Sequence, residues 1–336
     1  GQNGMFVDIS NAFSLAAIDM ADSQLNNNGT ILFPGDGFNA TVATGATLNV
    51  CAETTNGFLQ KMSFSGNTGD GFDVIVSDAG SRSDIDFHSV IAGASALDGL
   101  VGNTLNGTNV SVFNGGELNL RANTSHFDGN QGAGLLGSVN DQNGANTMGR
   151  FRIIGGTADN NLGSGFSLTA TNTTVGPVGV ATLTAQFQAD DLGTGISAQN
   201  NGGFGLNFVA SNLTPPGGGI VGNLLMTGGS TLLGNGAGTL NVNMNGADQA
   251  IIGLSGTFDG STTGDGIHID LQNITGLALV SLQGPGEVRN NAGDGIDVSL
   301  KNVAQGGVFI GGFSDVSDNG TGLNSIIGQD GIKVTM

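Results

Sequence analysis

Asp190 and Asp191 form the one adjacent pair of aspartates in this 336-residue chain. Paired carboxyl groups matter because glycoside hydrolysis uses one as a general acid and the other as a base or nucleophile. The three histidines, His88, His126 and His268, lie in Phe-His-Ser, Ser-His-Phe and Ile-His-Ile. No constellation of acid, base and nucleophile emerges from these positions. We therefore interpret Asp190-Asp191 as a solvated turn and predict no catalytic residues.

The densest cationic spot is Arg150-Phe151-Arg152. Alternation around Phe151 predicts that both guanidinium groups point outward from one strand. A lyase acting on an acidic polysaccharide needs an Arg or Lys base and calcium held by several carboxylates. A plain surface pair is the simpler interpretation, because a chain of net charge −19 repels a polyanion unless a metal intervenes.

Several aspartates lie beside glycine-rich turns, where their oxygens could hold calcium. They are the pairs Asp70 and Asp73, Asp265 and Asp270, and Asp294 and Asp297. Their Gly-x-Gly-x-Asp pieces partly match the calcium-binding nonapeptide repeat, but the period of that motif is absent here. We interpret these residues as turn residues. No cofactor is required by this interpretation, and weak calcium binding is the alternative.

The aromatic residues are all phenylalanine, 18 of them, with no Trp and no Tyr. Neutral-sugar sites favour Trp and Tyr, which combine a stacking face with a polar group. Most of the phenylalanines fall at positions expected to face inward. This composition argues against a sugar-processing groove.

The single cysteine, Cys51, has no partner for an intramolecular disulfide. It ends the alternating run Leu48-Asn49-Val50-Cys51, and the nearest cation in sequence is Lys61. A reactive thiol is expected close to a cation. We expect Cys51 to be a small buried apolar residue.

Charge and composition exclude several classes of protein. The chain has 8 Lys and Arg against 27 Asp and Glu, which is too few cations for a nucleic-acid-binding face. It has no apolar run long enough for membrane insertion. The 62 glycines lack the strict spacing of collagen.

One phrase recurs along the whole chain: Asn, three residues, Gly, then apolar residues at alternate positions, then Asn or Asp. The clearest copies are Asn67–Asp78 and Asn291–Asn302, and another begins at Thr262. The anchor glycines are Gly37, Gly71, Gly99, Gly134, Gly165, Gly205, Gly238, Gly266, Gly295 and Gly331. Their spacing of about 28–40 residues indicates a repeat protein.

Each copy has the period of a half-buried strand. After Gly266, for example, Ile267, Ile269 and Leu271 are expected to point inward, whereas His268 and the other alternate residues point outward. Three short strands fit in each repeat, and no helical period is visible. Asparagines at equivalent turns are expected to bond to one another in stacked coils. The stacked set is Asn67, Asn130, Asn161, Asn201 and Asn291.

The phrase Gly-Asp-Gly-Ile-Asp-Val after an Asn, with a closing Asn, resembles the right-handed parallel β-helix repeat of pectate-lyase-like proteins, most of all the large secreted or surface β-solenoids of bacteria. The resemblance covers nearly the whole chain. It implies an all-β fold: a single right-handed parallel β-helix of about ten coils and, at about 4.8 Å per coil, a rod about 50 Å long. Polygalacturonase-like members also carry Gly-His-Gly and Arg-Ile-Lys, and this chain has neither.

These observations favour a non-enzymatic extracellular structural protein, a cell-surface rod or filament subunit. Residues 1–336 are expected to form one continuous solenoid, and both ends resemble open solenoid edges, which would allow self-association end to end or continuation in a longer chain. One alternative is a surface adhesin that binds other surface polymers through loops around Val175–Val180 and Pro215-Pro216. The other is a polysaccharide lyase or hydrolase. No nucleic-acid partner and no membrane insertion are expected.

Overall fold

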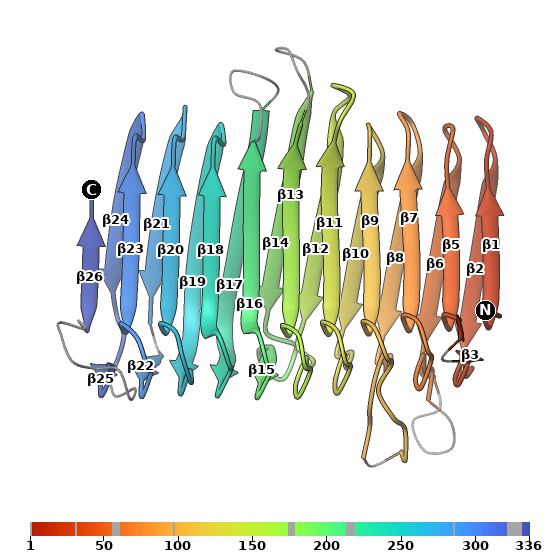
Figure 1. Ribbon diagram of the computed structural model, residues 1–336, viewed down its shortest axis with the longest axis horizontal. Coiled ribbons are helices and arrows are strands. Elements are labelled where there is room, and N and C mark those ends of the chain that lie inside the picture. The colour runs from red at the N-terminus through yellow and green to blue at the C-terminus, as the bar shows by residue number, and fades with distance from the viewer. Residues whose placement is uncertain are drawn as a thin grey trace.

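Two long sheets form the body of the molecule and lie one behind the other in Figure 1. The computed structural model describes residues 2–30, 32–55, 61–96, 98–173, 179–212, 219–284, 286–320 and 331–336. The loop residues 175–178 and Pro215-Pro216, proposed above as adhesive loops, lie outside this set. Every strand pairing within the two large sheets is parallel, and the first and last strands lie at opposite ends of the long axis.

The 11-stranded sheet takes one strand from each successive repeat. In spatial order its strands are β1 (Met5–Ile9), β5 (Phe38–Val42), β7 (Phe72–Ser77), β9 (Thr108–Phe113), β11 (Leu135–Asp141), β13 (Phe166–Asn172), β16 (Phe204–Asn212), β18 (Gly238–Asn245), β20 (Ile267–Gln272), β23 (Ile296–Lys301) and β26 (Ile332–Thr335).

The 13-stranded sheet takes the strand that follows in each repeat. Its main path is β2 (Leu15–Ala21), β6 (Thr47–Glu53), β8 (Arg82–His88), β10 (Glu117–Asn123), β12 (Thr147–Ile154), β14 (Val180–Gln188), β17 (Gly219–Leu233), β19 (Gln249–Asp259), β21 (Leu277–Gln283) and β24 (Gln305–Gly311). Short strands β15 (Ser197–Gln199), β22 (Glu287–Arg289) and β25 (Asp315–Ser317) extend it, and β3 (Gly29–Thr30) and β4 (Phe33–Pro34) form a separate antiparallel pair.

The strands form where apolar and polar residues alternate, so the expectation of an all-β fold built from parallel strands is confirmed. In β20, Ile267, Ile269 and Leu271 are fully buried, while the residues between them are half-buried. Ten phenylalanines lie in the core, and the rings of Phe38 and Phe72 stack at 4.6 Å. This matches the expectation that most phenylalanines point inward, although Phe13 and Phe309 are exposed.

Most anchor glycines are needed because the backbones approach closely, and their φ angles are ordinary. A Cβ on Gly134 would lie 2.6 Å from the carbonyl oxygen of Gly165, the anchor of the next repeat. Two anchors were assigned wrongly from the sequence. The residue that stacks on Gly71 in the following repeat is Gly107 rather than Gly99. The residue that stacks between Gly205 and Gly266 is Thr239 rather than Gly238.

The wrong anchors have a common cause, which is the variable length of the turns. Register partners are 27 residues apart between Thr108 and Leu135 but 40 residues apart between Phe166 and Leu206. The chain makes a short excursion before Gly107 that includes an antiparallel bridge between Ser95 and Leu100. This excursion is the reason why Gly99 was mistaken for the anchor glycine.

The predicted asparagine stack is present and is longer than expected. Each amide nitrogen donates to the amide oxygen of the asparagine in the following repeat, for example from Asn130 to Asn161 at 3.1 Å. The same oxygen accepts the backbone N–H of the preceding asparagine. Its members on either side of one interruption are Asn28, Asn67, Asn103, Asn130, Asn161, Asn201 and Asn235, then Asn291 and Asn319.

The interruption occurs at Ser261, whose N–H donates to Asn291 Oδ1 at 3.1 Å. Thr262 was assigned to this place from the sequence, and that assignment was wrong because this turn has one extra residue. Asparagines or glycines with positive φ precede many ladder positions, as at Asn160, Asn200 and Asn290, where φ lies between 54° and 58°. Asparagine tolerates this left-handed conformation better than most residues do.

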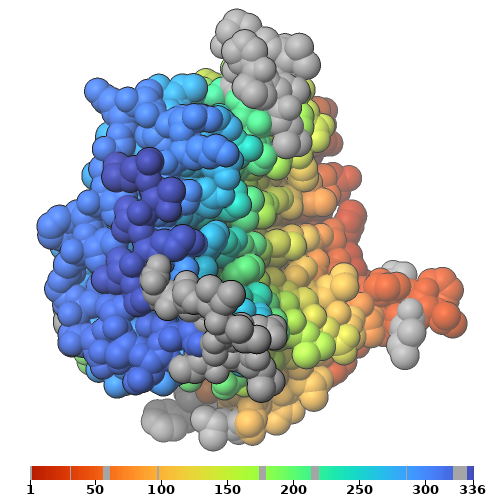
Figure 2. Space-filling model, turned by 60° about the vertical axis from the view of Figure 1, so that its left-hand side comes forward, coloured from red at the N-terminus to blue at the C-terminus, as the bar shows by residue number. Residues whose placement is uncertain are grey.

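The surface follows the same serial order as the interior. Figure 2 shows the colours changing in order from the C-terminal repeats in front to the N-terminal repeats behind, so neighbours in sequence are neighbours in space. Among the described residues there is no helix that could cross a bilayer.

Candidate functional site

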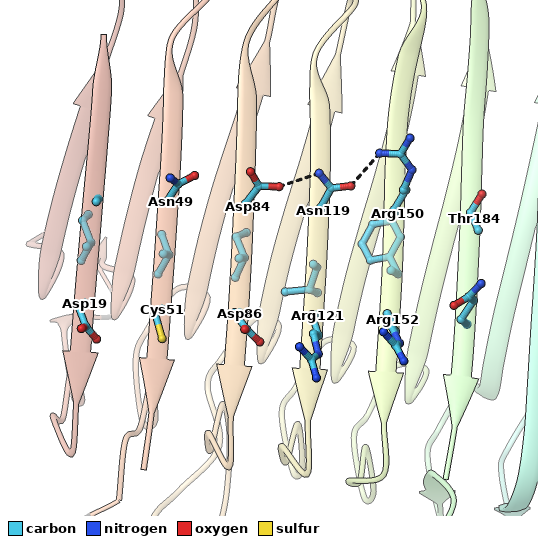
Figure 3. Close-up of a pocket in the computed structure, with 17 residues that line it drawn as sticks. Asp19, Asn49, Cys51, Asp84, Asp86, Asn119, Arg121, Arg150, Arg152 and Thr184 are labelled. Carbon is cyan, nitrogen blue, oxygen red and sulfur yellow. Dashed lines mark hydrogen bonds between the residues drawn. The ribbon is translucent and has the colours of Figure 1, made fainter. Parts of the chain in front are cut away.

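An open groove of about 640 Å³ runs across the outer face of the 13-stranded sheet from β2 to β14. Two rows of outward side chains line it, one residue per strand, and we call it the arginine groove (Figure 3). The first row is Asp19, Cys51, Asp86, Arg121, Arg152 and Gln186. The second row is Ala17, Asn49, Asp84, Asn119, Arg150 and Thr184.

Arg121 and Arg152 are direct register partners on neighbouring strands, β10 and β12. Like charges in this arrangement repel one another. Within the described part of the chain neither guanidinium forms an ion pair, and Arg152 Nε donates only to the neutral Gln188 Oε1 at 3.0 Å. Arg121 has Asp86 as its other register partner, on β8, but forms no ion pair with it among the described residues. The two guanidinium groups therefore offer N–H donors that no carboxylate occupies, which is the arrangement that binds carboxylate, sulfate or phosphate groups.

The neighbouring row is neutralised within the protein. Arg150 Nη1 lies 2.6 Å from Glu117 Oε1, and Asn119 Nδ2 donates to Asp84 Oδ1 at 2.7 Å. Burial alone would raise the pKa of Asp84, but hydrogen bonds from Arg82 and Asn119 and the nearby arginine charges outweigh it and lower that pKa. Arg82 and Arg150 therefore have partners within the groove, in contrast to the pair beside them.

Cys51 lies in the arginine groove, and the expectation that it is buried in the core was wrong. The inward positions of β6 are Leu48 and Val50, so Cys51 faces outward between Asp19 and Asp86 and is half-buried. Burial, followed by the charges of Asp19, Glu53 and Asp86, raises the pKa of its thiol. The thiol therefore stays protonated at neutral pH.

Arg150 and Arg152 point outward on either side of the buried Phe151, as the alternation predicted. The sequence did not single out Arg121, which lies 31 positions before Arg152. Its pairing with Arg152 can be recognised only when the repeats are placed in register, because the two residues belong to different repeats.

Beyond β14 the same outer face becomes apolar. Leu225, Leu279 and Phe309 are 40%, 40% and 58% exposed on β17, β21 and β24. The cluster of arginines is thus confined to the N-terminal half of the sheet, although charged residues recur on its short C-terminal strands, as at Glu287, Arg289 and Asp315.

The aspartates proposed from the sequence for calcium form two separate clusters on the 11-stranded sheet. In the first, Asp70 and Asp73 are buried beside Asp36 and accept hydrogen bonds from asparagine amides. Burial, then the charges of Asp70 and Asp36, raises the pKa of Asp73 to about 7. Asn109 Nδ2 donates to Asp73 Oδ1 at 3.0 Å, so amide donors already occupy these carboxylates.

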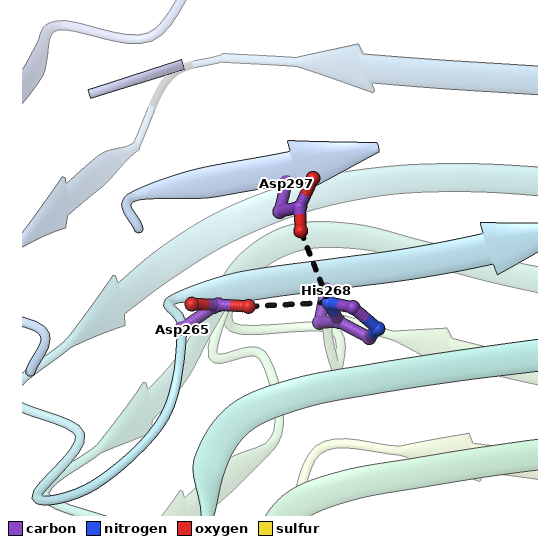
Figure 4. A group of neighbouring side chains, drawn as sticks. All are labelled: Asp265, His268 and Asp297. Carbon is purple, nitrogen blue, oxygen red and sulfur yellow. Dashed lines mark hydrogen bonds and ion pairs between the residues drawn. The ribbon is translucent and has the colours of Figure 1, made fainter. Parts of the chain in front are cut away.

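The second cluster joins Asp265, His268 and Asp297 (Figure 4). The hydrogen bond from His268 to Asp265 raises the pKa of this histidine, against the opposing effect of burial. Asp294 lies beside Asp297 through a shared contact with Lys333. Asp270, grouped with Asp265 from the sequence, is instead a partner of Gln272.

The adjacent aspartates Asp190 and Asp191 lie in a turn after β14 and do not line the groove. Asp190 Oδ1 accepts the backbone N–H groups of Leu192 and Thr194 at 2.9 and 2.8 Å. This carboxylate therefore organises its own turn.

Comparison with known proteins gave no match among family models, curated proteins or solved structures. Membership of the pectate-lyase-like superfamily thus stays a prediction from the repeat.

Proposed function

We propose that this protein is a non-enzymatic extracellular structural protein, a cell-surface rod or filament subunit that stacks end to end. The observation that carries the proposal is the uninterrupted parallel pairing from β1 to β26 in one sheet. A ladder of this kind transmits stiffness along its length, because each repeat is fixed by its two neighbours. We further propose that the solenoid is right-handed, has about ten coils and belongs to the pectate-lyase-like superfamily.

The edges of the sheet supply the means of stacking. Met5 N–H donates to Gly37 O, and Ile296 N–H donates to Gly331 O, so inward-facing residues direct their N–H groups toward the following repeat. Ile332 and Val334 are the register partners of Ile296 and Val298, so their N–H groups point beyond β26. A further strand in the same register, from neighbouring sequence or from another copy, would satisfy them.

Sedimentation velocity at increasing protein concentration tests this stacking. The unaltered chain is expected to form a series of larger species. Val334→Pro removes one N–H from the open edge and is expected to suppress that series, whereas the matched control Val334→Ala keeps the N–H and is expected to associate normally. Equal association of both variants, or a chain that stays monomeric throughout, would contradict end-to-end stacking.

A second candidate function is adhesion to an acidic surface polymer through the arginine groove. The unneutralised pair Arg121 and Arg152 favours it, as does the extension of the groove across several strands, which suits a linear polymer. The strongly acidic remainder of the chain opposes approach of a polyanion at long range, so binding depends on these two side chains.

Binding of polygalacturonate at low salt, with a neutral glucan as the uncharged control, tests adhesion. The double variant Arg121→Ala/Arg152→Ala is expected to lose at least about tenfold in affinity. Lys301→Ala removes one exposed cation from the other sheet and is expected to bind normally. Equal weakening in both variants would overturn this candidate, and release of shortened sugar chains would favour the lyase or hydrolase alternative.

A further inference from the structure

Asp265, His268 and Asp297 bring three potential metal ligands to one place on the outer face of the 11-stranded sheet. His268 on β20 is the register partner of Asp297 on β23, and Asp265 comes from the turn that precedes β20. His268 Nδ1 lies 3.1 Å from Asp265 Oδ2 and 3.7 Å from Asp297 Oδ2. Atoms bound to one metal at about 2.1 Å lie about 3.0–3.4 Å apart, so the two separations from His268 need little adjustment, and all three ligand atoms lie within 4.8 Å of one another.

One oxygen of Asp297 has no partner in the described part of the chain. Asp297 is only 9% exposed, and its buried Oδ1 has no hydrogen-bond partner among the described residues. The oxygen that faces His268 and Lys333 is Oδ2, so a cation would satisfy the costly unpaired Oδ1 only if Asp297 bound it through both oxygens.

The equivalent positions near the N-terminus show what a purely structural cluster looks like in this fold. There Asn39 Nδ2 donates to both Asp36 Oδ2 and Asp73 Oδ2, at 2.8 and 2.9 Å, and Asn109 donates to the remaining oxygen of Asp73. Every carboxylate oxygen of Asp73 thus has an amide donor. In the second cluster a histidine occupies the place of Asn39, and no asparagine supplies these donors among the described residues.

The ion pairs of Lys333 on β26 show that the carboxylates of this cluster attract a cation. Its Nζ lies 3.1 Å from Asp297 Oδ2 and 3.7 Å from Asp294 Oδ2. The lysine side chain is 46% exposed, so it can leave the carboxylate at little cost. A metal ion would compete with this ammonium group for Asp297.

We propose that Asp265, His268 and Asp297 bind a divalent transition-metal ion, with Lys333 as a competing internal cation. One imidazole nitrogen with two carboxylates suits Zn²⁺, whereas calcium prefers oxygen ligands alone. Binding would fasten β20 to β23 across two successive repeats.

Isothermal titration of the full chain with Zn²⁺, and separately with Ca²⁺, tests the site, supported by the shift of the thermal transition that Zn²⁺ causes. His268→Gln is expected to weaken Zn²⁺ binding by at least about tenfold, and Lys333→Met to strengthen it. The matched control is His126→Gln, because His126 lies 3.8 Å from Asp128 but belongs to no three-ligand cluster in the described chain.

Opposite effects of the His268 and Lys333 substitutions would support the proposal, since general damage to the fold would weaken binding in both. If Lys333→Met does not fold, Lys333→Gln, which also removes the competing positive charge, replaces it and is expected to strengthen binding. Absence of Zn²⁺ binding, equal loss in the His268 and His126 variants, or binding of Ca²⁺ in preference to Zn²⁺ would overturn the proposal.

Discussion

At the residue scale, stacking places like residues beside one another. For ionised residues this arrangement costs free energy, because like charges repel. Asp73 lies close to Asp70 and Asp36, and its neighbours Asn39 and Asn109 relieve the repulsion only by donating amide hydrogens. Asp159 repeats the situation at another corner: burial, then the charge of Asp128, raises its pKa to about 6. An asparagine ladder has no such cost, because each amide both donates and accepts.

Asp73→Asn should remove a loss of stability that the unaltered protein undergoes at alkaline pH. Asp73 has a pKa of about 7 when folded and an ordinary value near 4 when unfolded, so the folded state holds a proton that the unfolded state releases. The contribution of Asp73 to stability is therefore fully present below about pH 4 and is lost as the pH rises through 7. Between pH 5 and pH 8 the variant is expected to lose less stability than the unaltered protein by on the order of 2 kcal/mol, although its single amide oxygen can accept only one of the two donors Asn39 and Asn109.

Urea unfolding of both proteins at pH 5 and pH 8 measures this difference. Asp191→Asn, a substitution at an exposed turn carboxylate, serves as the control and is expected to change stability by less than about 0.5 kcal/mol at either pH. A difference between Asp73→Asn and the unaltered protein that is the same at both pH values would contradict the argument.

At the element scale, the turns decide whether repeats can stack. The carbonyl oxygen of Gly165 lies where a Cβ of Gly134 would approach to 2.6 Å, and the oxygen of Phe127 lies equally close. Both obstacles are backbone atoms rather than the ends of flexible side chains, and the oxygen of Gly165 is held by the N–H of Leu135. Gly307 on β24 differs, because a Cβ there would meet only Leu279 Cδ1 at 3.8 Å.

Gly134→Ala is therefore expected to cost about 2–4 kcal/mol in the free energy of unfolding. Gly307→Ala is the matched control and is expected to change that free energy by no more than about 0.5 kcal/mol. Thermal or urea unfolding of the two variants gives the comparison. Similar stability of both would mean that close backbone approach is not the reason for the anchor glycines.

The sequence predicts these elements well because each repeat carries its own pattern. Alternation identified the strands, and the recurrent Asn and Gly identified the stacked turns. Lateral neighbours were harder to predict, since turns of unequal length hide the register. Arg121 beside Arg152, and His268 beside Asp297, depend on pairings between repeats. Cys51 was misplaced because a one-residue choice of phase reverses the face of every side chain in a strand.

At the scale of the whole molecule, cations are concentrated although the chain is strongly acidic. Half of the 8 Lys and Arg residues lie on β8, β10 and β12 of one sheet. These four are Arg82, Arg121, Arg150 and Arg152. Most of the remaining charges are acidic, which opposes side-by-side contact between charged faces. The apolar part of the outer face around Leu225, Leu279 and Phe309 is the exception, and the proposed route of association is through the sheet edges.

Electron microscopy of the purified chain over a range of concentrations tests the central claim most directly. End-to-end stacking predicts unbranched rods that lengthen with concentration, with a repeat of about 4.8 Å along the rod axis. Separate particles of one fixed length at every concentration would contradict the claim that this protein is a filament subunit.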